Sequence, residues 1–240
     1  MAGPGRHRAS AFKTGTRCIC RMARSKKRTL AEAVAHAERV LKEKDRLREE
    51  AFRDSREIQR AASAVLRAGV PRTAKGVEAA REQLALASAQ SKSLKRRLES
   101  HPELYESGMM ETPLQELAEA YVLLAHSRGE PIPTFDEISV TPAAFILGVA
   151  DAIGEFRRQL VGAIRHGRIK EAERHLDAME EAFSAIAAIA LPDAIVPVRK
   201  KVDTARSLIE RSSSEVALAV RMHEHEKAIR AAGVPRRDGR

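Results

Sequence analysis

Apolar residues recur at helical spacing along most of the chain, and this pattern begins at Thr29. Thr29 and Glu32 match a capping box, in which each residue satisfies a free backbone N–H of the other. Apolar positions then follow at steps of three and four residues until Gly69 and Pro71 end the pattern. The spacing predicts one helix of about 40 residues, far longer than the roughly 11–12 typical of globular proteins. Such a helix needs partners along its whole length.

Further helical segments follow, separated by glycine and proline. Few aromatic residues and many Ala, Leu, Glu and Arg residues favour helices throughout. The expected segments are 73–98, a short turn of helix between Pro102 and Gly108, 112–126, a central helix over 141–158, one from Gly167 to about Ala190, and one from Pro197 to about Ile229.

The central segment, TPAAFILGVADAIGEFRR, places acids in an apolar setting. Thr141 can cap the helix and Pro142 suits its first position, and an unbroken apolar run follows. A helix that is apolar on every side belongs inside a protein. Asp151 and Glu155 then lie at i, i+4 on one helix face, where a buried carboxylate must be paired, hydrogen-bonded or bound to a metal.

A second segment upstream repeats this pattern. Thr112, Pro113 and Gln115 predict a capping-box start with proline at the first helical position. Glu116 and Glu119 lie at i, i+3 before an apolar tail, so they share a helix face. If the two helices pack side by side, their four acids form a cluster of hard oxygen ligands.

Two interpretations of these acids stay open. No histidine completes a Glu-x-x-His pair of the di-iron type, so a carboxylate cluster favours Mg²⁺ or Mn²⁺, ions that serve phosphoryl chemistry. Alternatively, the acids form buried salt bridges with Arg157, Arg158 or Arg165. The chain has no P-loop, nucleophile elbow or dinucleotide fingerprint that would indicate another chemistry.

The net charge of +10 lies mainly in the N-terminal segment. Residues 1–28 hold nine Lys and Arg and no acid, which leaves 34 basic and 33 acidic residues in the rest. This segment lacks hydrophobic periodicity, so we expect a disordered basic extension. Three interpretations of this segment stay open. Translation starts at Met22 and residues 1–21 are not part of the protein, the segment is a targeting signal, or it is a basic arm that binds nucleic acid. Its Cys18 and Cys20, the only cysteines, are expected to be free thiols.

Elsewhere, a basic cluster ends the second helix at Lys95, Arg96 and Arg97. These cations either complement the helix dipole or contact phosphates. Residues 231–240 are expected to be a disordered basic tail. No apolar run approaches the roughly 20 residues that span a bilayer, and no secretory signal is present, so we expect a cytoplasmic protein without a membrane partner.

Several segments together resemble the translin family, specifically translin-associated factor X and its archaeal-type relatives. The motif ILGVADAIGEFRR is preceded by QELAEA and followed by VRKKVDTARSLIE, and SREIQRAASAVLRAG fits the first helix. The resemblance covers roughly residues 45–225. The sequence departs from the usual pattern at Phe145, Ile146 and Ala152, positions that concern packing more than chemistry.

The resemblance implies an all-α protein, an antiparallel bundle of about six to seven helices with long first and last helices over residues 29–230. Such proteins assemble into hollow oligomers, typically octamers, that enclose RNA or single-stranded DNA. The X-type subunit supplies a Mg²⁺-dependent endoribonuclease site. Matched to the family, the catalytic acids are Glu116, Glu119 and Asp151, with Glu155 as a fourth metal ligand.

Candidates for contacts with nucleic acid are Lys95, Arg96, Arg97, Arg157 and Arg158, although no motif fixes these basic positions. The first functional hypothesis is an endoribonuclease dependent on Mg²⁺ or Mn²⁺, within a homo-oligomeric shell. The second is a non-catalytic oligomer that binds RNA or single-stranded DNA. A third, a purely structural helical scaffold, requires the acids to be salt-bridged.

Overall fold

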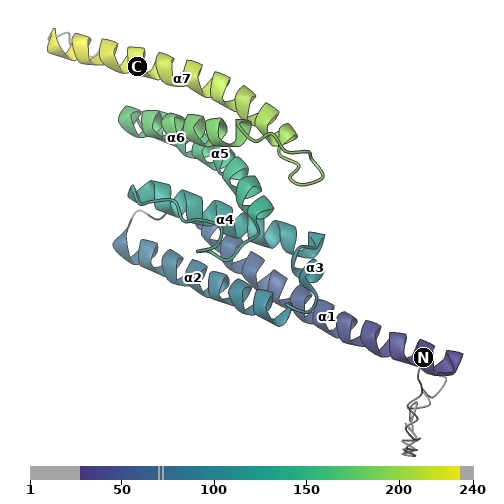
Figure 1. The fold of residues 1–240 in the computed structure, drawn as a ribbon. Coiled ribbons are helices and arrows are strands. Elements are labelled where there is room, and N and C mark those ends of the chain that lie inside the picture. The colour runs from purple at the N-terminus through teal and green to yellow at the C-terminus, as the bar shows by residue number, and fades with distance from the viewer. Residues whose placement is uncertain (1–27, 70, 72, 233–240) are drawn as a thin grey trace, which may run out of the picture. The chain divides into compact units, whose positions relative to one another are not determined.

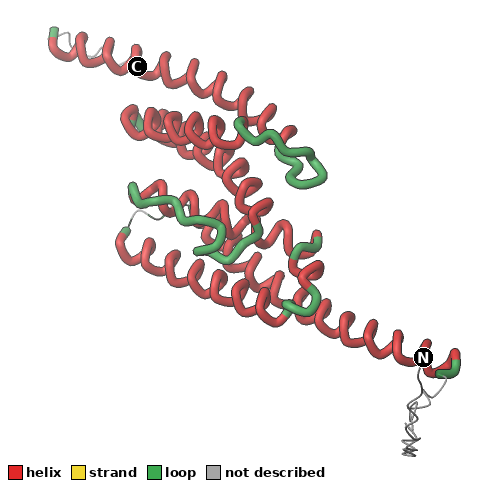
Figure 2. The backbone as a smooth tube through the Cα atoms, in the orientation of Figure 1, coloured by secondary structure: helices red, strands yellow, loops and turns green. Residues whose placement is uncertain are grey.

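A computed structural model describes residues 28–69, 71 and 73–232, and within these ranges the only regular secondary structure is helical (Figures 1 and 2). The bundle is all-α, as predicted. None of the described helices is long and apolar enough to cross a membrane. The helices are α1 (Leu30–Ala68), α2 (Ala74–Arg97), α3 (Pro102–Tyr105), α4 (Gly108–Arg128), α5 (Pro142–Arg165), α6 (Ile169–Ala187) and α7 (Arg199–Ala231).

The predicted helix starts at Thr29, Thr73 and Thr141 are confirmed. The Thr29 N–H donates to Glu32 Oε2 at 2.8 Å, and the Glu32 N–H donates to Thr29 Oγ1 at 3.2 Å, which completes the capping box. Thr73 and Thr141 each accept a 3.2 Å hydrogen bond from the backbone N–H three residues on. The predicted extension, residues 1–28, lies outside the described residues except for its last member, as does the predicted tail from residue 233 onward.

The expected start of the acidic helix at Thr112 is wrong, because α4 begins at Gly108 and carries Pro113 inside it. Met110, Leu114 and Leu117 lie at i, i+4 and i+7 and are fully buried, so extending the helix upstream adds Met110 to the apolar stripe. This burial outweighs the loss of one backbone hydrogen bond at Pro113. Glu116 and Glu119 therefore lie in the middle of the helix and not in its first turns.

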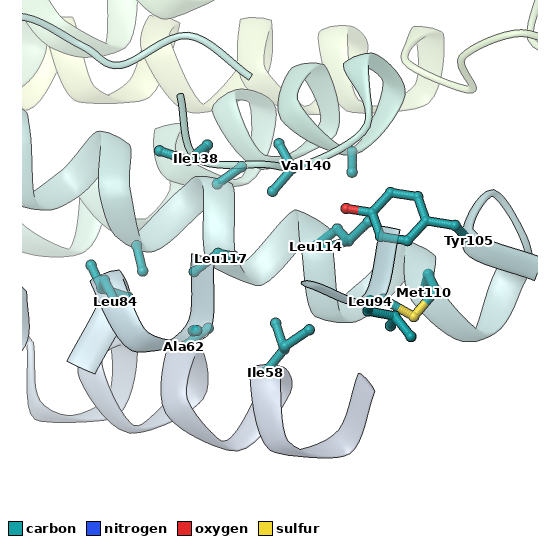
Figure 3. Packing of buried hydrophobic residues seen from close by; sticks show 14 of the residues in the cluster. Ile58, Ala62, Leu84, Leu94, Tyr105, Met110, Leu114, Leu117, Ile138 and Val140 are labelled. Carbon is teal, nitrogen blue, oxygen red and sulfur yellow. The ribbon is translucent and has the colours of Figure 1, made fainter. Parts of the chain in front are cut away.

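The chain divides into two compact units, with the boundary between Leu41 and Lys42. In the first unit, the early turns of α1 expose Leu30, Val34 and Leu41. In the second unit, one hydrophobic cluster joins α2, α3 and α4 to α1 from Leu47 onward, and Figure 3 shows Ile58 on α1 among the side chains of this cluster. A second cluster joins α5, α6 and α7 to the far side of α4. Helix α4 thus lies between two layers, as Figure 1 also shows.

The contact between α4 and α5 depends on Gly148, which is buried in α5. A Cβ atom added there would lie 2.6 Å from the Gln115 carbonyl oxygen and 2.9 Å from the Glu119 backbone nitrogen. Real side chains do not make such contacts, so only glycine permits this approach. Asp151 follows Gly148 by one helical turn, so the close contact sets the α5 acids beside those of α4.

Candidate metal centre between α4 and α5

The structure brings together the four acids predicted from sequence, two from α4 and two from α5. All four side chains are half-buried. Burial is the main cause that raises the pKa of Glu119 to about 8, and the charges of Asp151, Glu155 and Glu116 raise it further, while Lys201 opposes the rise. No hydrogen bond or ion pair to the Glu119 carboxylate comes from any described residue. The negative charge of Glu119 is therefore disfavoured by its acidic neighbours, and no directly bonded group among the described residues compensates for it.

Helix α1 holds the carboxylate of Glu116. Gln59 Nε2 donates a 3.0 Å hydrogen bond to Glu116 Oε1, and the Ser63 hydroxyl donates to Oε2. Gln59 and Ser63 are one helical turn apart on α1, so both reach the same acid. Both belong to the segment SREIQRAASAVLRAG, although the sequence alone did not indicate that they orient an acid.

The carboxylate of Asp151 is held from two other helices. Lys201, in the first turn of α7, forms an ion pair with Asp151 Oδ1, and the Gln115 side-chain amide on α4 donates to Oδ2. The exposed fraction of both ion-paired side chains is 31%. The salt-bridge interpretation thus holds in part, with a lysine that the sequence analysis did not name. Glu155 does pair with Arg158, at 2.6 Å.

The acid set fits a hard divalent cation in kind, because carboxylate oxygens are the preferred ligands of Mg²⁺ and their mutual repulsion is relieved by a cation. In the structure, however, the four carboxylates are not yet arranged as ligands around one ion. Across the described part of the chain, no group of three or more His, Cys, Asp or Glu side chains is already arranged to hold a metal ion. Glu116 and Asp151 would have to exchange their present hydrogen-bond partners for a shared ligand.

Most of the predicted nucleic-acid contacts are engaged within the protein. Arg157 makes a two-pronged ion pair with Glu215 on α7, with N–O distances of 2.6 and 2.7 Å, and its side chain is only 19% exposed. Arg97 pairs with Asp54, and Lys95 lies over the ring of Tyr105. Of the remaining two, Arg158 pairs with Glu155, and Arg96 is exposed.

A cleft of about 380 Å³ beside Asp151 offers other basic residues. Lys200, Lys201 and Thr204 line it from α7, and Asp151 and Gly154 line it from α5. These α7 residues belong to the segment VRKKVDTARSLIE, but their approach to the acids follows from helix packing and not from a motif.

Comparison with solved structures identifies this architecture. A crystal structure of AfC3PO aligns with a TM-score of 0.68 and 32% sequence identity, over 78% of this chain and 96% of that one. The chain belongs to the C3PO/translin family. A second AfC3PO structure, a complex with duplex RNA, aligns with a TM-score of 0.65 and 31% identity over the same shares.

Two further comparisons show a shared fold and a sequence relative. Apo-NeC3PO shares the fold with a TM-score of 0.66 and 16% identity, over 80% of this chain and 100% of that one. An uncharacterized protein of Methanocaldococcus jannaschii is 29% identical over 193 residues, 79% of this chain and 85% of the relative. No family model matches the chain. The family assignment therefore rests on the two AfC3PO structures, and apo-NeC3PO shares the fold.

Proposed function

We propose that this protein is a metal-dependent endoribonuclease that cleaves single-stranded or partly paired RNA with Mg²⁺ or Mn²⁺ at the acid cluster of α4 and α5. The observation that carries the proposal is the pairing of acids from two helices around Glu119, whose pKa rises to about 8 through burial and its acidic neighbours. A carboxyl group with a strongly perturbed pKa beside other acids is typical of functional sites. The duplex RNA complex of AfC3PO supports RNA as the substrate class.

Each residue of the cluster has a role that follows from its contacts. Glu116, Glu119 and Asp151 would hold the cation, with Glu155 at the edge because Arg158 already binds it. Gln59 and Ser63 orient Glu116, and Gln115 orients Asp151. A divalent cation at such a site activates water and stabilises the oxygens of an in-line phosphoryl displacement.

A second candidate, a non-catalytic oligomer that binds RNA or single-stranded DNA, is favoured by one observation. Lys201 already neutralises Asp151, and Gln59 and Ser63 already satisfy Glu116, so two of the acids have partners without any metal. In that case the acids stabilise the bundle, and the nucleic acid is bound but not cut. Mg²⁺-dependent cleavage separates the two candidates.

The decisive experiment compares Glu119→Gln and Asp151→Asn with the wild type on a labelled RNA oligonucleotide. We expect Mg²⁺-dependent cleavage to fall by about two or more orders of magnitude in both variants, because each removes a charged ligand at nearly constant volume. Retention of the same oligonucleotide in EDTA should persist. Intact RNA with wild-type protein in Mg²⁺ and in Mn²⁺ would contradict the nuclease and leave the binding function.

Melting temperatures of the same variants test the role of each acid. Glu119→Gln should melt at or above the wild-type temperature in EDTA, because it removes a group whose charged form is disfavoured in the folded state by burial and by its acidic neighbours. Asp151→Asn should melt lower, because Lys201 loses its partner in a half-buried position. A large loss of stability in Glu119→Gln would show that this acid is structural.

A further inference from the structure

The ion pair between Lys201 and Asp151 occupies the acid that the proposed metal would need. Lys201 binds Asp151 Oδ1 and Gln115 binds Oδ2, so both oxygens of this carboxylate are engaged. Lys201 is also the cation whose charge opposes the acidic neighbours of Glu119. One ammonium group therefore serves as counter-ion to more than one member of the cluster.

Lys201 has space to leave Asp151. The cleft between α5 and α7 opens beside both residues, and a lysine carries its charge on a flexible four-carbon chain. Thr204 lies one helical turn beyond Lys201 and lines the same cleft, where its hydroxyl donates to the Lys200 carbonyl oxygen and can still accept a hydrogen bond from an ammonium. A released ammonium would thus remain beside the Thr204 hydroxyl, in a cleft whose other walls include apolar residues such as Ile153 and Leu208.

The charge of the cleft suits an anion. Lys200 is exposed in the same wall of the cleft, and no described residue forms an ion pair with its side chain. The first turn of α7 contains Arg199, Lys200 and Lys201 and no acid, whereas the helix dipole favours negative charge there. Negative charge in the cleft would satisfy both the lysines and the helix end once Asp151 is engaged elsewhere.

We propose that Lys201 is an internal counter-cation of the acid cluster, which a divalent cation displaces from Asp151, and that the released ammonium then binds a phosphodiester of nucleic acid lying in the α5–α7 cleft. The inference rests on the proposed function and extends it. It makes metal and nucleic acid bind cooperatively, because each favours the state in which Lys201 has left Asp151. Lys201 thus contacts the nucleic acid directly in this scheme.

The test measures Mn²⁺ binding to the full chain from the electron paramagnetic resonance signal of the free ion. Titrations are run with and without an oligodeoxythymidylate, which lacks the 2′-hydroxyl, and are corrected for Mn²⁺ bound by the oligonucleotide alone. The variants are Lys201→Met and its matched control Lys200→Met, which removes the same charge from the same cleft but breaks no ion pair. Lys201→Gln, which keeps a hydrogen-bond donor for Asp151, replaces Lys201→Met if the latter does not fold.

We expect the wild type to bind Mn²⁺ more tightly when the oligonucleotide is present. Lys201→Met should bind Mn²⁺ about tenfold more tightly than the wild type without oligonucleotide, because a half-buried competing charge is gone, and should gain nothing further when it is added. Lys200→Met should keep the wild-type affinity for Mn²⁺ without oligonucleotide, because Lys200 forms no ion pair with the acids. It should bind the oligonucleotide more weakly, because Lys200 lines the same cleft, but should still gain affinity for Mn²⁺ once the oligonucleotide is saturating.

The outcomes separate this inference from the proposed function. A wild type that binds no Mn²⁺ would refute the metal site itself, and the inference with it. A wild type that binds Mn²⁺, with Lys201→Met unchanged or still responsive to the oligonucleotide, would overturn the inference alone. Equal effects of Lys200→Met and Lys201→Met would also overturn it, by assigning the effect to net charge.

Discussion

The four acids of the cluster differ in how their charges are balanced. Glu116 accepts hydrogen bonds from two side chains of α1, and Asp151 is held by Lys201 and Gln115. Glu155 has Arg158. Glu119 has acidic neighbours but no such partner among the described residues, so a cation bound at the site would favour its charged form.

The raised pKa of Glu119 predicts a pH-dependent stability in metal-free protein. The unfolded glutamate releases its proton near pH 4.5, whereas the folded one retains it until about pH 8. Between these values the folded state binds more protons, so raising the pH lowers the free energy of unfolding. The melting temperature of the wild type in EDTA should therefore fall relative to that of Glu119→Gln between pH 5 and 8, as scanning calorimetry would measure.

The comparison with Glu119→Gln is needed because His175, which is buried, and His126, which is half-buried, act in the opposite direction. Burial lowers the pKa of His175 to about 4 and also lowers that of His126, so their contribution to stability grows as the pH rises through the acidic range. A difference between the two proteins that stays constant from pH 5 to 8 would contradict the raised pKa of Glu119.

The sequence predicts which acids form the cluster, but it does not predict which residues bind these acids. The spacing of Glu116 to Glu119 and of Asp151 to Glu155 shows in the sequence that each pair shares a helix face. The partners Gln59, Ser63 and Lys201 lie more than 45 residues away in the chain and are set by tertiary packing. Periodicity carries no information on such contacts.

Among the helices, the contact of α4 with α5 is the one on which the site depends, and Gly148 makes it possible. Gly148→Ala should lower the free energy of unfolding by about 1–3 kcal/mol, because the added methyl group overlaps the α4 backbone at Gln115 and Glu119. It should also weaken Mn²⁺ binding by moving the two pairs of acids apart. Chemical denaturation and the Mn²⁺ titration measure the two effects.

Gly162 provides the matched control on the same helix. It lies in α5, and a Cβ atom there would meet nothing within 4 Å. Gly162→Ala should therefore be neutral or stabilise the protein by up to about 1 kcal/mol, because alanine favours the helix. Equal behaviour of Gly148→Ala and Gly162→Ala would show that the close approach at Gly148 is not essential.

The predicted helix starts match the structure where a capping residue sets them. The capping residues Thr29, Thr73 and Thr141 act within their own first turn, so the sequence alone locates these starts. At α4 the local signal, Thr112 followed by Pro113, competes with burial of Met110 in the core, and burial prevails. The outcome depends on neighbouring helices that a local pattern does not contain.

On the scale of the whole molecule, α7 carries an apolar stripe that the second unit leaves uncovered. Leu218, Met222 and Ile229 are 63%, 58% and 40% exposed, and their spacing places them on one helix face. Exposed apolar stripes of this kind mark association surfaces. We therefore expect a homo-oligomer larger than a dimer, in which this face of α7 is covered by another copy.

The double substitution Leu218→Lys with Met222→Lys tests this expectation. Two lysines cannot be buried unpaired at an interface, so the assembly should dissociate to smaller species at micromolar concentration, as multi-angle light scattering would measure. Leu86→Lys is the control, because Leu86 is 66% exposed on α2, apart from the stripe, and its replacement should leave the mass unchanged. Helical content should be wild-type in both proteins, since these side chains contribute little to the core.

A wild type that is monomeric over this concentration range would contradict the oligomer, whereas an intact oligomer in the double variant would assign the interface to another surface.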